Sequence, residues 1–312
     1  MTMESGDENF FHESVLLEET VEYLAPGAGK VIVDGTLGGG GHTKALLDAG
    51  ARVIALDHDP EALAYAMKRI GATAGRFQPV HANFSELENV LDRLGVAQID
   101  GGLLDLGVSS HQLDKAERGF SFMREGPLDM RMNLLAATSA ADLVNNASAE
   151  QLEGIFRNFG EEPAARRIAA WIVEERGRKP FETTLELAAA VEKVSPRHGK
   201  THPATRVFQA LRIAVNRELE SLEDGLEQFG RRLAPGGRFA VITFHSLEDR
   251  IVKTFFKTRS MEWIDRPEWP EARANPARIF NLLKTKPVIA GDGEQQRNPR
   301  SRSAKLRIVE KL

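Results

Sequence analysis

The chain has 312 residues, of which 42% are hydrophobic, and its formal net charge is −4. Its length exceeds the usual size of a single domain, so we expect two domains or one domain with a large insertion. The absence of cysteine excludes disulfides, thiolate metal sites and cysteine nucleophiles, and we predict no metal site. Residues 1–8 are polar and acidic and no apolar run is long enough to cross a bilayer, so we expect a cytoplasmic protein without a membrane partner.

A glycine-rich turn follows the first predicted strand. After a leading helix over 11–24, residues 31–33 are all β-branched, Asp34 follows them, and four consecutive glycines occupy positions 38–41. Such a turn lets the backbone approach a ligand at the carboxyl edge of a parallel sheet, where α/β proteins bind nucleotides. The alternative is a loop that only turns the chain.

The glycine run matches neither common phosphate-binding pattern. Thr43 and Lys44 stand where the third glycine of G-x-G-x-x-G would be, and no register gives G-x-x-x-x-G-K-[ST]. A nicotinamide dehydrogenase is therefore the least favoured function. Asp34 instead begins an Asp-Gly-x-x-Gly-Gly-Gly pattern that resembles the first motif of class I S-adenosylmethionine-dependent methyltransferases, whose ligand contains adenosine but no phosphate.

Two acids lie at the end of the second predicted strand, residues 52–57. Asp57 comes about 20 residues after the start of the glycine motif, the spacing at which an acid accepts hydrogen bonds from an adenosine ribose. Asp59 precedes Pro60 and is predicted to cap the next helix, which gives it a structural role. We therefore assign the ribose to Asp57, with a plain loop acid as the alternative.

The third and fourth predicted strands, residues 77–81 and 99–107, also end in candidate ligand groups. Phe84 follows the third strand, where its ring either lies against an adenine or packs in the core. Ser85 and Glu88 are predicted to form a capping box for the next helix. Asp105 lies near the end of the fourth strand, at the same edge of the sheet.

The segment 108–131 has little periodicity, and a loop of this length in a compact domain is usually functional or disordered. Its aromatic residues argue against disorder. Interleaved aromatic and basic side chains predict that it holds a nucleic-acid base and its phosphates. The residues concerned are Arg118, Phe120, Phe122, Met123, Arg124, Met130 and Arg131.

From about Ala140 to Arg212 the alternation of strands and helices stops, and one long helix is predicted from Pro203 toward Leu233. About 130 residues separate the fourth strand from the next, at 239–244, whereas a crossover needs far fewer. We therefore predict an α/β sheet interrupted by an all-helical insertion. The predicted parts are 1–112 and 213–312 for the sheet domain, the second with a basic tail, and 113–212 for an RNA-recognition insertion.

Three basic clusters occur in this acidic chain, at 176–179, 197–200 and 297–311. The last has six Lys or Arg residues against Glu310, which gives a net charge of +5. Most clusters of this kind are solvated surface, but three of them suggest focused contacts with a polyanion.

Six ordered motifs extend over nearly the whole chain. They are Val33–Thr36 with Gly40–His42, Leu104–Ser110, Arg118–Arg124 with Gly126–Met132, His202–Arg206, Phe244–Arg250 and Asn298–Arg300. Together they resemble the ribosomal small-subunit methyltransferase H family, also called MraW. The resemblance implies a class I (Rossmann-like) methyltransferase sheet with an inserted helical domain. It also implies methyl transfer from S-adenosylmethionine to the exocyclic N4 of a cytidine in the decoding region of 16S ribosomal RNA.

The same resemblance implies which residues bind the cofactor: Gly40, Gly41, His42, Asp57, Phe84, Asp105 and Gln112. The implied partner is 16S ribosomal RNA within the small ribosomal subunit. The sequence does not set the oligomeric state, and a homodimer is one alternative.

The residues also restrict the chemistry. A chain without cysteine is poorly suited to carbon-5 methylation of a pyrimidine, which ordinarily needs a thiolate. Cytosine N4 has a delocalised lone pair, so its attack on a methyl group requires hydrogen-bond acceptors and in-line positioning. We expect the carbonyls of 106–109, with the Ser109 side chain, to accept the N4 hydrogens, and His245 or Ser246 to border the base. The alternative for His245 is a structural histidine, and no catalytic residue is assigned.

Two other functions remain open. A small-molecule methyltransferase would share the glycine turn and Asp57 but would have no use for the basic tail. A non-catalytic assembly factor would use the same fold only to bind ribosomal RNA. Transfer of labelled methyl groups to small subunits separates an enzyme from such a factor.

Overall fold

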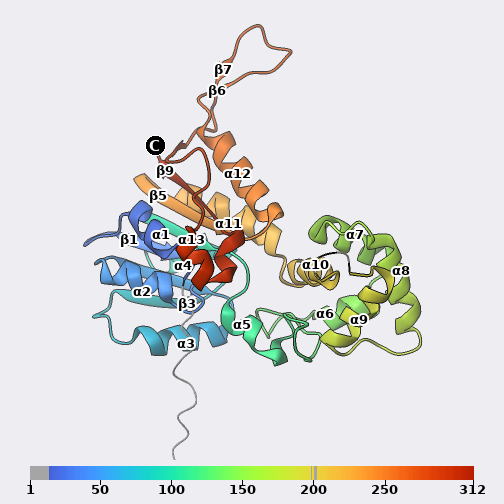
Figure 1. Cartoon of the computed structure of the whole chain (residues 1–312). Helices are drawn as coiled ribbons and strands as arrows, with labels where there is room; N and C mark the ends of the chain where they lie inside the picture. Colours follow the sequence, from blue (N-terminus) through green and yellow to red (C-terminus); the bar gives the residue numbers. More distant parts are fainter. Residues whose placement is uncertain (1–13, 198, 200–201) are drawn as a thin grey trace, which may run out of the picture. The chain divides into compact units, whose positions relative to one another are not determined.

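The computed structural model describes residues 14–197, 199 and 202–312, which cluster into two compact units (Figure 1). The first, here called the sheet unit, contains residues 14–57, 61–107 and 225–312. The second, the helical unit, contains 58–60 and 108–224. Within the described residues, no helix is both long and apolar enough to cross a membrane.

A seven-stranded sheet with the order β3-β2-β1-β4-β5-β9-β8 forms the centre of the sheet unit. Its strands are β1 (Val31–Asp34), β2 (Arg52–Asp57), β3 (Phe77–His81), β4 (Ile99–Asp105), β5 (Leu233–Thr243), β8 (Phe280–Leu282) and β9 (Lys305–Lys311). The first five strands in the order are parallel, and β9 and β8 are antiparallel to their neighbours. The predicted α/β class is thus confirmed.

Helices connect these strands. They are α1 (Leu17–Leu24), α2 (Gly41–Asp48), α3 (Pro60–Ile70), η1 (Phe84–Glu86), α4 (Leu87–Arg93), α12 (Ser246–Ser260), α13 (Asp292–Arg297) and η3 (Pro299–Ser303). Helix α11 (Glu218–Arg232) begins in the helical unit and ends in the sheet unit. Beyond α12, the short strands β6 (Trp263–Ile264) and β7 (Arg273–Ala274) pair as a separate antiparallel hairpin, which projects from the sheet unit in Figure 1.

The direction in which the sheet is built reverses between β1 and β4. After β1 the chain proceeds outward through β2 and β3, and it then places β4 on the other side of β1. Loops that leave two neighbouring strands in opposite directions open a crevice at the carboxyl ends of those strands, where α/β proteins bind ligands. The last residues of β1 and β4 are Asp34 and Asp105, so the topology brings these two carboxyl groups to the crevice.

Close packing under the sheet explains a glycine in its central strand. The rings of Phe229 and Phe239 stack with centroids 4.7 Å apart and planes within 9°. A Cβ atom at Gly102 of β4 would lie 2.5 Å from Phe229 Cδ1, closer than carbon atoms approach in a packed core. Gly102 therefore admits the aromatic pair that anchors α11 to the sheet.

The helical unit has its own hydrophobic core, built around Phe156, Ile172, Val191 and Leu211. Its helices are α5 (Ser110–Asp114), η2 (Ala116–Arg118), α6 (Ala140–Asn146), α7 (Ala149–Gly160), α8 (Ala165–Arg176), α9 (Thr184–Val194) and α10 (Ala204–Asn216). Ser148 with Gln151 and Thr183 with Glu186 form capping boxes at the starts of α7 and α9.

Several element boundaries differ from the predictions. The capping box before α4 is formed by Asn83 and Glu86: the Asn83 side-chain Oδ1 accepts the Ser85 N–H at 2.9 Å, and the Asn83 N–H donates to Glu86 Oε2 at 3.1 Å. The prediction that Ser85 and Glu88 form this capping box was wrong. The leading helix starts only at Leu17, and residues 11–13 lie outside the described chain. β5 begins at Leu233, whereas the strand was predicted to begin at residue 239.

The predicted long helix from Pro203 is two helices, α10 and α11, which meet at Arg217. Arg217 has a left-handed backbone with φ 51°. The side chain of Asn216 is occupied by the loop backbone, since it donates to the Met130 carbonyl and accepts from the Met132 N–H, both at 2.8 Å. These bonds hold the end of α10 against the segment 130–132, and α11 leaves in a new direction.

Arg118 is the buried anchor of the loop that precedes α6. It pairs with Asp59 at 2.9 Å, and the two side chains are 3% and 0% exposed. Its Nη2 also donates to the carbonyls of Arg131 and Met132. Gln112 Nε2 donates to the same Asp59 oxygen at 2.8 Å. Asp59 is therefore more than the predicted helix cap, and Arg118 serves the fold rather than a base or phosphate.

Replacing Arg118 by Met should strongly destabilise the helical unit, because Asp59 would remain buried without a cation. We expect a loss of about 3–5 kcal/mol in the free energy of unfolding, measured by urea denaturation. Arg167→Met removes an exposed cation of α8 and should change stability by no more than about 0.5 kcal/mol. Equal losses in the two variants would contradict this role for the buried pair.

Candidate functional site

The glycine turn after β1 is held to the sheet by backbone and carboxylate bonds. Gly35 N–H donates to the Leu103 carbonyl, and Leu37 N–H donates to the Leu56 carbonyl, both at 2.9 Å. Gly38 N–H donates to Asp57 Oδ2 at 2.8 Å. Gly38 and Gly40 have φ angles of +50° and +76°, which residues with a side chain rarely adopt. The turn is thus fixed across β1, β2 and β4 before any ligand binds.

Asp57 lies at the end of β2, where the sequence placed the ribose ligand, and it is half-buried. One of its carboxylate oxygens already accepts the Gly38 N–H. Asp57 therefore joins the glycine turn to the end of β2, a structural role that the sequence did not indicate.

Phe84 packs against a glycine of α11. A Cβ atom at Gly225 would lie 2.6 Å from Phe84 Cδ2, and one at Gly35 would lie 3.0 Å from Phe84 Cβ. The ring is half-buried, so one part of its surface packs on the sheet unit and another part faces outward at the strand ends. Part of the ring therefore packs as the core alternative predicted, and its contact with an adenine stays a prediction.

Asp34 is buried and hydrogen-bonded at the end of β1. Its Oδ2 accepts the Thr43 hydroxyl at 2.7 Å, and its Oδ1 accepts the Thr36 N–H at 3.1 Å. Burial raises the pKa of the Asp34 carboxyl to about 6, an effect that the hydrogen bonds from Thr43 and Thr36 only partly offset.

Asp105 is the second carboxyl group of the crevice. Its N–H donates to the Thr36 hydroxyl at 2.6 Å, which ties the end of β4 to the glycine turn. Burial raises its pKa well above the usual range, and the nearby charges of Asp34 and Glu248 raise it further. The Oδ1 atom is buried and has no hydrogen-bond partner among the described residues. A buried oxygen of this kind is suited to receive a donor from a ligand.

His42 lies beside Asp105 in the first turn of α2 and is 5% exposed. Its Nε2 is 3.1 Å from the Val15 carbonyl, and because a carbonyl only accepts, Nε2 carries a proton. Its Nδ1 lies 3.6 Å from Asp105 Oδ2. His42 thus limits the space around the Asp105 carboxyl group.

A buried acid in the first turn of α12, Glu248, bonds the chain just after β5, a role that the sequence-based predictions missed. Glu248 Oε2 accepts the Phe244 N–H at 2.8 Å. By the register of β4 and β5, that N–H would otherwise be the next donor to the Leu106 carbonyl. No described residue donates to this carbonyl in its place. Glu248 therefore ends the hydrogen bonding between β4 and β5, and it leaves the Leu106 carbonyl, immediately after Asp105, as an open acceptor.

His245 and Ser246 lie at the start of α12, at the same end of β5. His245 is the N-cap residue of this helix, and its Nδ1 accepts the Glu248 N–H at 3.4 Å. Its Nε2 is 3.0 Å from Glu248 Oε1, but the two are not aligned as a hydrogen bond. The pattern of a residue at the cap and an acid three positions later was the signal in the sequence for Glu248. Ser246 is exposed.

Ser109 and Gln112 belong to the helical unit. Ser109 N–H donates to Gln112 Oε1 at 3.0 Å, and Gln112 N–H donates to the Ser109 hydroxyl at 3.2 Å. Gln112 is buried and also bonds Asp59. Within the helical unit these two predicted site residues therefore form the start of α5, while the other predicted residues all belong to the sheet unit.

The loop 108–131 and the basic clusters are mostly engaged within the protein. Phe122 packs on His202 and Phe208, and Phe120 and Met130 are buried, whereas Met123 and Arg124 are exposed. Of the basic residues, Arg176 bonds carbonyls of α6, and Arg178 and Lys179 pair with glutamates. Lys305 and Arg307 of the tail both pair with Asp249. Two of the four residues of the cluster at 197–200 lie outside the described residues.

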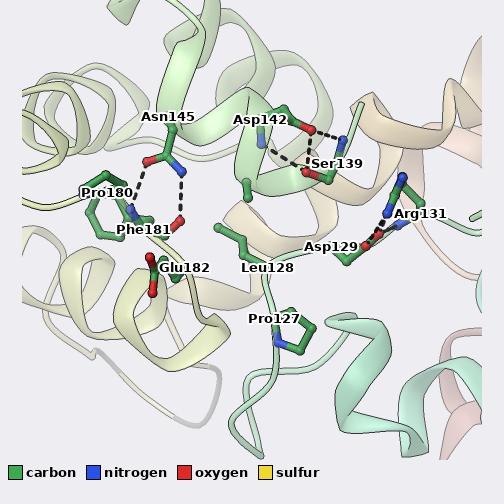
Figure 2. Close-up of a pocket in the computed structure, with 11 residues that line it drawn as sticks. Pro127, Leu128, Asp129, Arg131, Ser139, Asp142, Asn145, Pro180, Phe181 and Glu182 are labelled. Atoms are coloured by element: carbon green, nitrogen blue, oxygen red, sulfur yellow. Dashed lines mark hydrogen bonds and ion pairs between the residues drawn. The ribbon is translucent and has the colours of Figure 1, made fainter. Parts of the chain in front are cut away.

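A pocket of about 370 Å³ lies within the helical unit, next to α6 and the segment 127–131 (Figure 2). Figure 2 shows that its polar side chains bond to one another or to the backbone: Arg131 pairs with Asp129, Ser139 with Asp142, and Asn145 with the Phe181 backbone. None of the predicted cofactor residues lines this pocket, so we do not assign it to the cofactor.

The family model and the relatives with similar sequences that match this chain all describe the same kind of methyltransferase. Residues 9–312 match the family model described as the MraW methylase family. A ribosomal RNA small subunit methyltransferase H of Geobacter sulfurreducens is 51% identical over 97% of this chain and 99% of its own length. One from Geobacter sp. is 50% identical over 98% of this chain and 100% of its own. A solved rRNA methylase from Streptococcus thermophilus is 13% identical, with a TM-score of 0.44 over 96% of this chain and 98% of that one.

The raised pKa of Asp34 should appear in the pH dependence of stability. The native carboxyl keeps its proton up to about pH 6, while the unfolded one loses it near pH 4, so folding becomes less favourable as pH rises between these values. The free energy of unfolding of the wild type minus that of Asp34→Asn should fall by about 2.4 kcal/mol from pH 4 to pH 7. Urea denaturation across this range measures it, and a difference that is constant with pH contradicts the assignment.

Proposed function

Because this chain belongs to the MraW methylase family, we propose that it transfers a methyl group from S-adenosylmethionine to the exocyclic N4 of a cytidine in the decoding region of 16S ribosomal RNA. We place this substrate within the small ribosomal subunit, and hence the protein in the cytoplasm. The observation that carries the proposal is the convergence of the glycine turn, Asp57 and Asp105 on the carboxyl edge of one sheet. A homodimer stays a prediction.

The residues at this edge fit the cofactor. In the proposal, Gly40, Gly41 and His42 lie along it, and Asp57 accepts hydrogen bonds from its ribose. Phe84 offers a half-buried aromatic face for the adenine. The orphaned oxygen of Asp105 suits a positively charged donor. When bound, the cofactor supplies a methyl group on a sulfonium centre.

The acidic character of the edge supports a cation rather than a phosphate as ligand. Asp34 and Asp105 both have raised pKa values because ionising them in a buried crevice is unfavourable. A positive charge nearby stabilises the ionised carboxylates, whereas a phosphate would add to the repulsion. Gln112 remains a predicted cofactor residue, and its bond to Asp59 fixes its amide within the helical unit.

On the acceptor side, the open carbonyl of Leu106 supports the predicted activation of cytosine N4. A carbonyl that accepts one N4 hydrogen withdraws the amino group from conjugation with the ring and directs its lone pair. Glu248 keeps this acceptor available because it takes the N–H that would otherwise occupy it. The target base must leave its stack to reach this position, as is general for enzymes that modify bases.

Methyl transfer itself is the first test. Purified protein with radiolabelled S-adenosylmethionine and unmethylated small subunits should label one cytidine of 16S ribosomal RNA at N4, identified by nucleoside mass mapping. Absence of labelled RNA from complete reactions would support the non-catalytic assembly factor instead. Label on small molecules alone would support the small-molecule methyltransferase.

Asp57→Asn should weaken cofactor binding about tenfold to a hundredfold, because a hydrogen bond to a charged acceptor contributes about 1.5–3 kcal/mol. The asparagine carbonyl can still accept the Gly38 N–H, so the glycine turn should keep its anchor. Titration calorimetry with S-adenosylmethionine measures the affinity. Asp48→Asn, at the exposed end of α2, is the matched control, and equal affinities for both variants would exclude Asp57 as the ribose ligand.

The residues predicted to border the base can be separated from those that bind the cofactor. Ser109→Ala, His245→Ala and Ser246→Ala should each bind S-adenosylmethionine with unchanged affinity. At least one of them should slow single-turnover methylation by about tenfold or more, because the loss of one side chain that positions a reacting group lowers the rate by at least that factor. Wild-type rates in all three variants would remove these side chains from the mechanism and leave the backbone acceptor alone.

A further inference from the structure

Helix α12 carries a row of cations along its exposed side. Successive residues of an α-helix are about 100° apart, which puts Arg250, Lys253 and Lys257 within a stripe about 60° wide. All three are exposed, as are Ser246 and Thr254 next to them. The opposite side of the helix, with Val252 and Phe256, is buried in the sheet unit. The row, here called the α12 stripe, consists of Arg250, Lys253 and Lys257.

Neither acid of α12 pairs with Lys253 or Lys257 of the α12 stripe. Glu248 is buried and bonds the Phe244 N–H, and Asp249 is paired with Lys305 and Arg307. No ion pair connects Lys253 or Lys257 to any residue that the structure describes. In a chain with a net charge of −4, Lys253 and Lys257 therefore present two exposed positive charges with no ion-pair partner among the described residues.

The α12 stripe starts at the proposed reaction site. β5 ends at Thr243 and α12 begins at Ser246, at the carboxyl edge of the sheet. From there the helix runs away from the edge (Figure 1). Arg250 and Lys257 are separated by about 10 Å along the helix axis, a distance on the scale of a few nucleotides.

We propose that the α12 stripe binds the phosphate backbone of the RNA strand that flanks the target cytidine. The inference rests on the proposed function, since it takes the target base to enter at the carboxyl edge of the sheet. Lysine and arginine bind phosphates by displacing counterions, without reading the sequence, and so fix the strand's register at the site. The exposed side of α12 contains only Ser, Thr, Lys and Arg, and it lacks the aromatic or aliphatic anchors that a protein partner would use.

The test is the double variant Lys253→Gln/Lys257→Gln. The probe is a fluorescent single-stranded RNA with the 16S sequence around the target cytidine, titrated at several salt concentrations. Each phosphate contact contributes about 0.7 to the slope of log affinity against log salt, so the slope should become shallower by about 1.4. At 0.1 M salt this corresponds to a loss of affinity of about 25-fold. The KM for small subunits should rise in the same direction.

Lys68→Gln/Arg93→Gln is the matched control, since it removes two exposed cations from the last turns of α3 and α4. It should keep the wild-type affinity and slope. Calorimetry with S-adenosylmethionine checks that both double variants are folded.

The two proposals fail in different ways. If the slopes and affinities of the two double variants are equal, the α12 stripe does not bind RNA, even where the wild type methylates small subunits. If the wild type transfers no methyl group to RNA, the proposed function fails. A slope that still becomes shallower in Lys253→Gln/Lys257→Gln would then support the α12 stripe as an RNA surface of a non-catalytic protein.

Discussion

Two carboxyl groups at the ends of neighbouring strands, one buried and one partly buried, are the constraint on which this molecule depends. Asp34 and Asp105 end β1 and β4, where the strand order reverses, and burial raises the pKa of both. The Thr36 N–H and the Thr43 hydroxyl donate to the Asp34 carboxyl group, and the Thr36 hydroxyl accepts the backbone N–H of Asp105. These hydrogen bonds require the glycine turn, because only a tight turn brings the groups of Thr36 and Thr43 back to the strand ends. An edge built in this way favours a cationic nucleoside over a phosphorylated one.

The second set of interactions uses acids to arrange neighbours rather than to bind a ligand. Asp57 holds the glycine turn, Asp59 holds Gln112 and Arg118, and Glu248 takes a backbone N–H from the end of the β4–β5 ladder. In each case a carboxylate fixes backbone or amide groups whose positions matter for the site. Acids close to the strand ends therefore have two roles, to bind a ligand or to position neighbouring groups. Only the hydrogen-bond partners of each acid show which role it has.

Much of the fold was predictable because strands and glycines have strong local signals. The bounds of β2 and β3 follow from their hydrophobic residues, and the helical insertion follows from the length between β4 and β5. The break at Arg217 was not predictable, since it depends on Asn216 bonding a loop more than eighty residues earlier in the chain. Similarly, the sequence counts Lys305 and Arg307 as free charge, although Asp249 pairs with both, and it gives no weight to Lys253 and Lys257 because they are not adjacent.

The three residues His58–Pro60 lie between parts of the sheet unit in the chain but pack with the helical unit. They bring Asp59 to Arg118, whose guanidinium is buried. A fragment of 108–224 expressed alone would lack this carboxylate, so the helical unit is not a transplantable module. An exchange of this insertion between related enzymes should therefore include the acid after β2 as well.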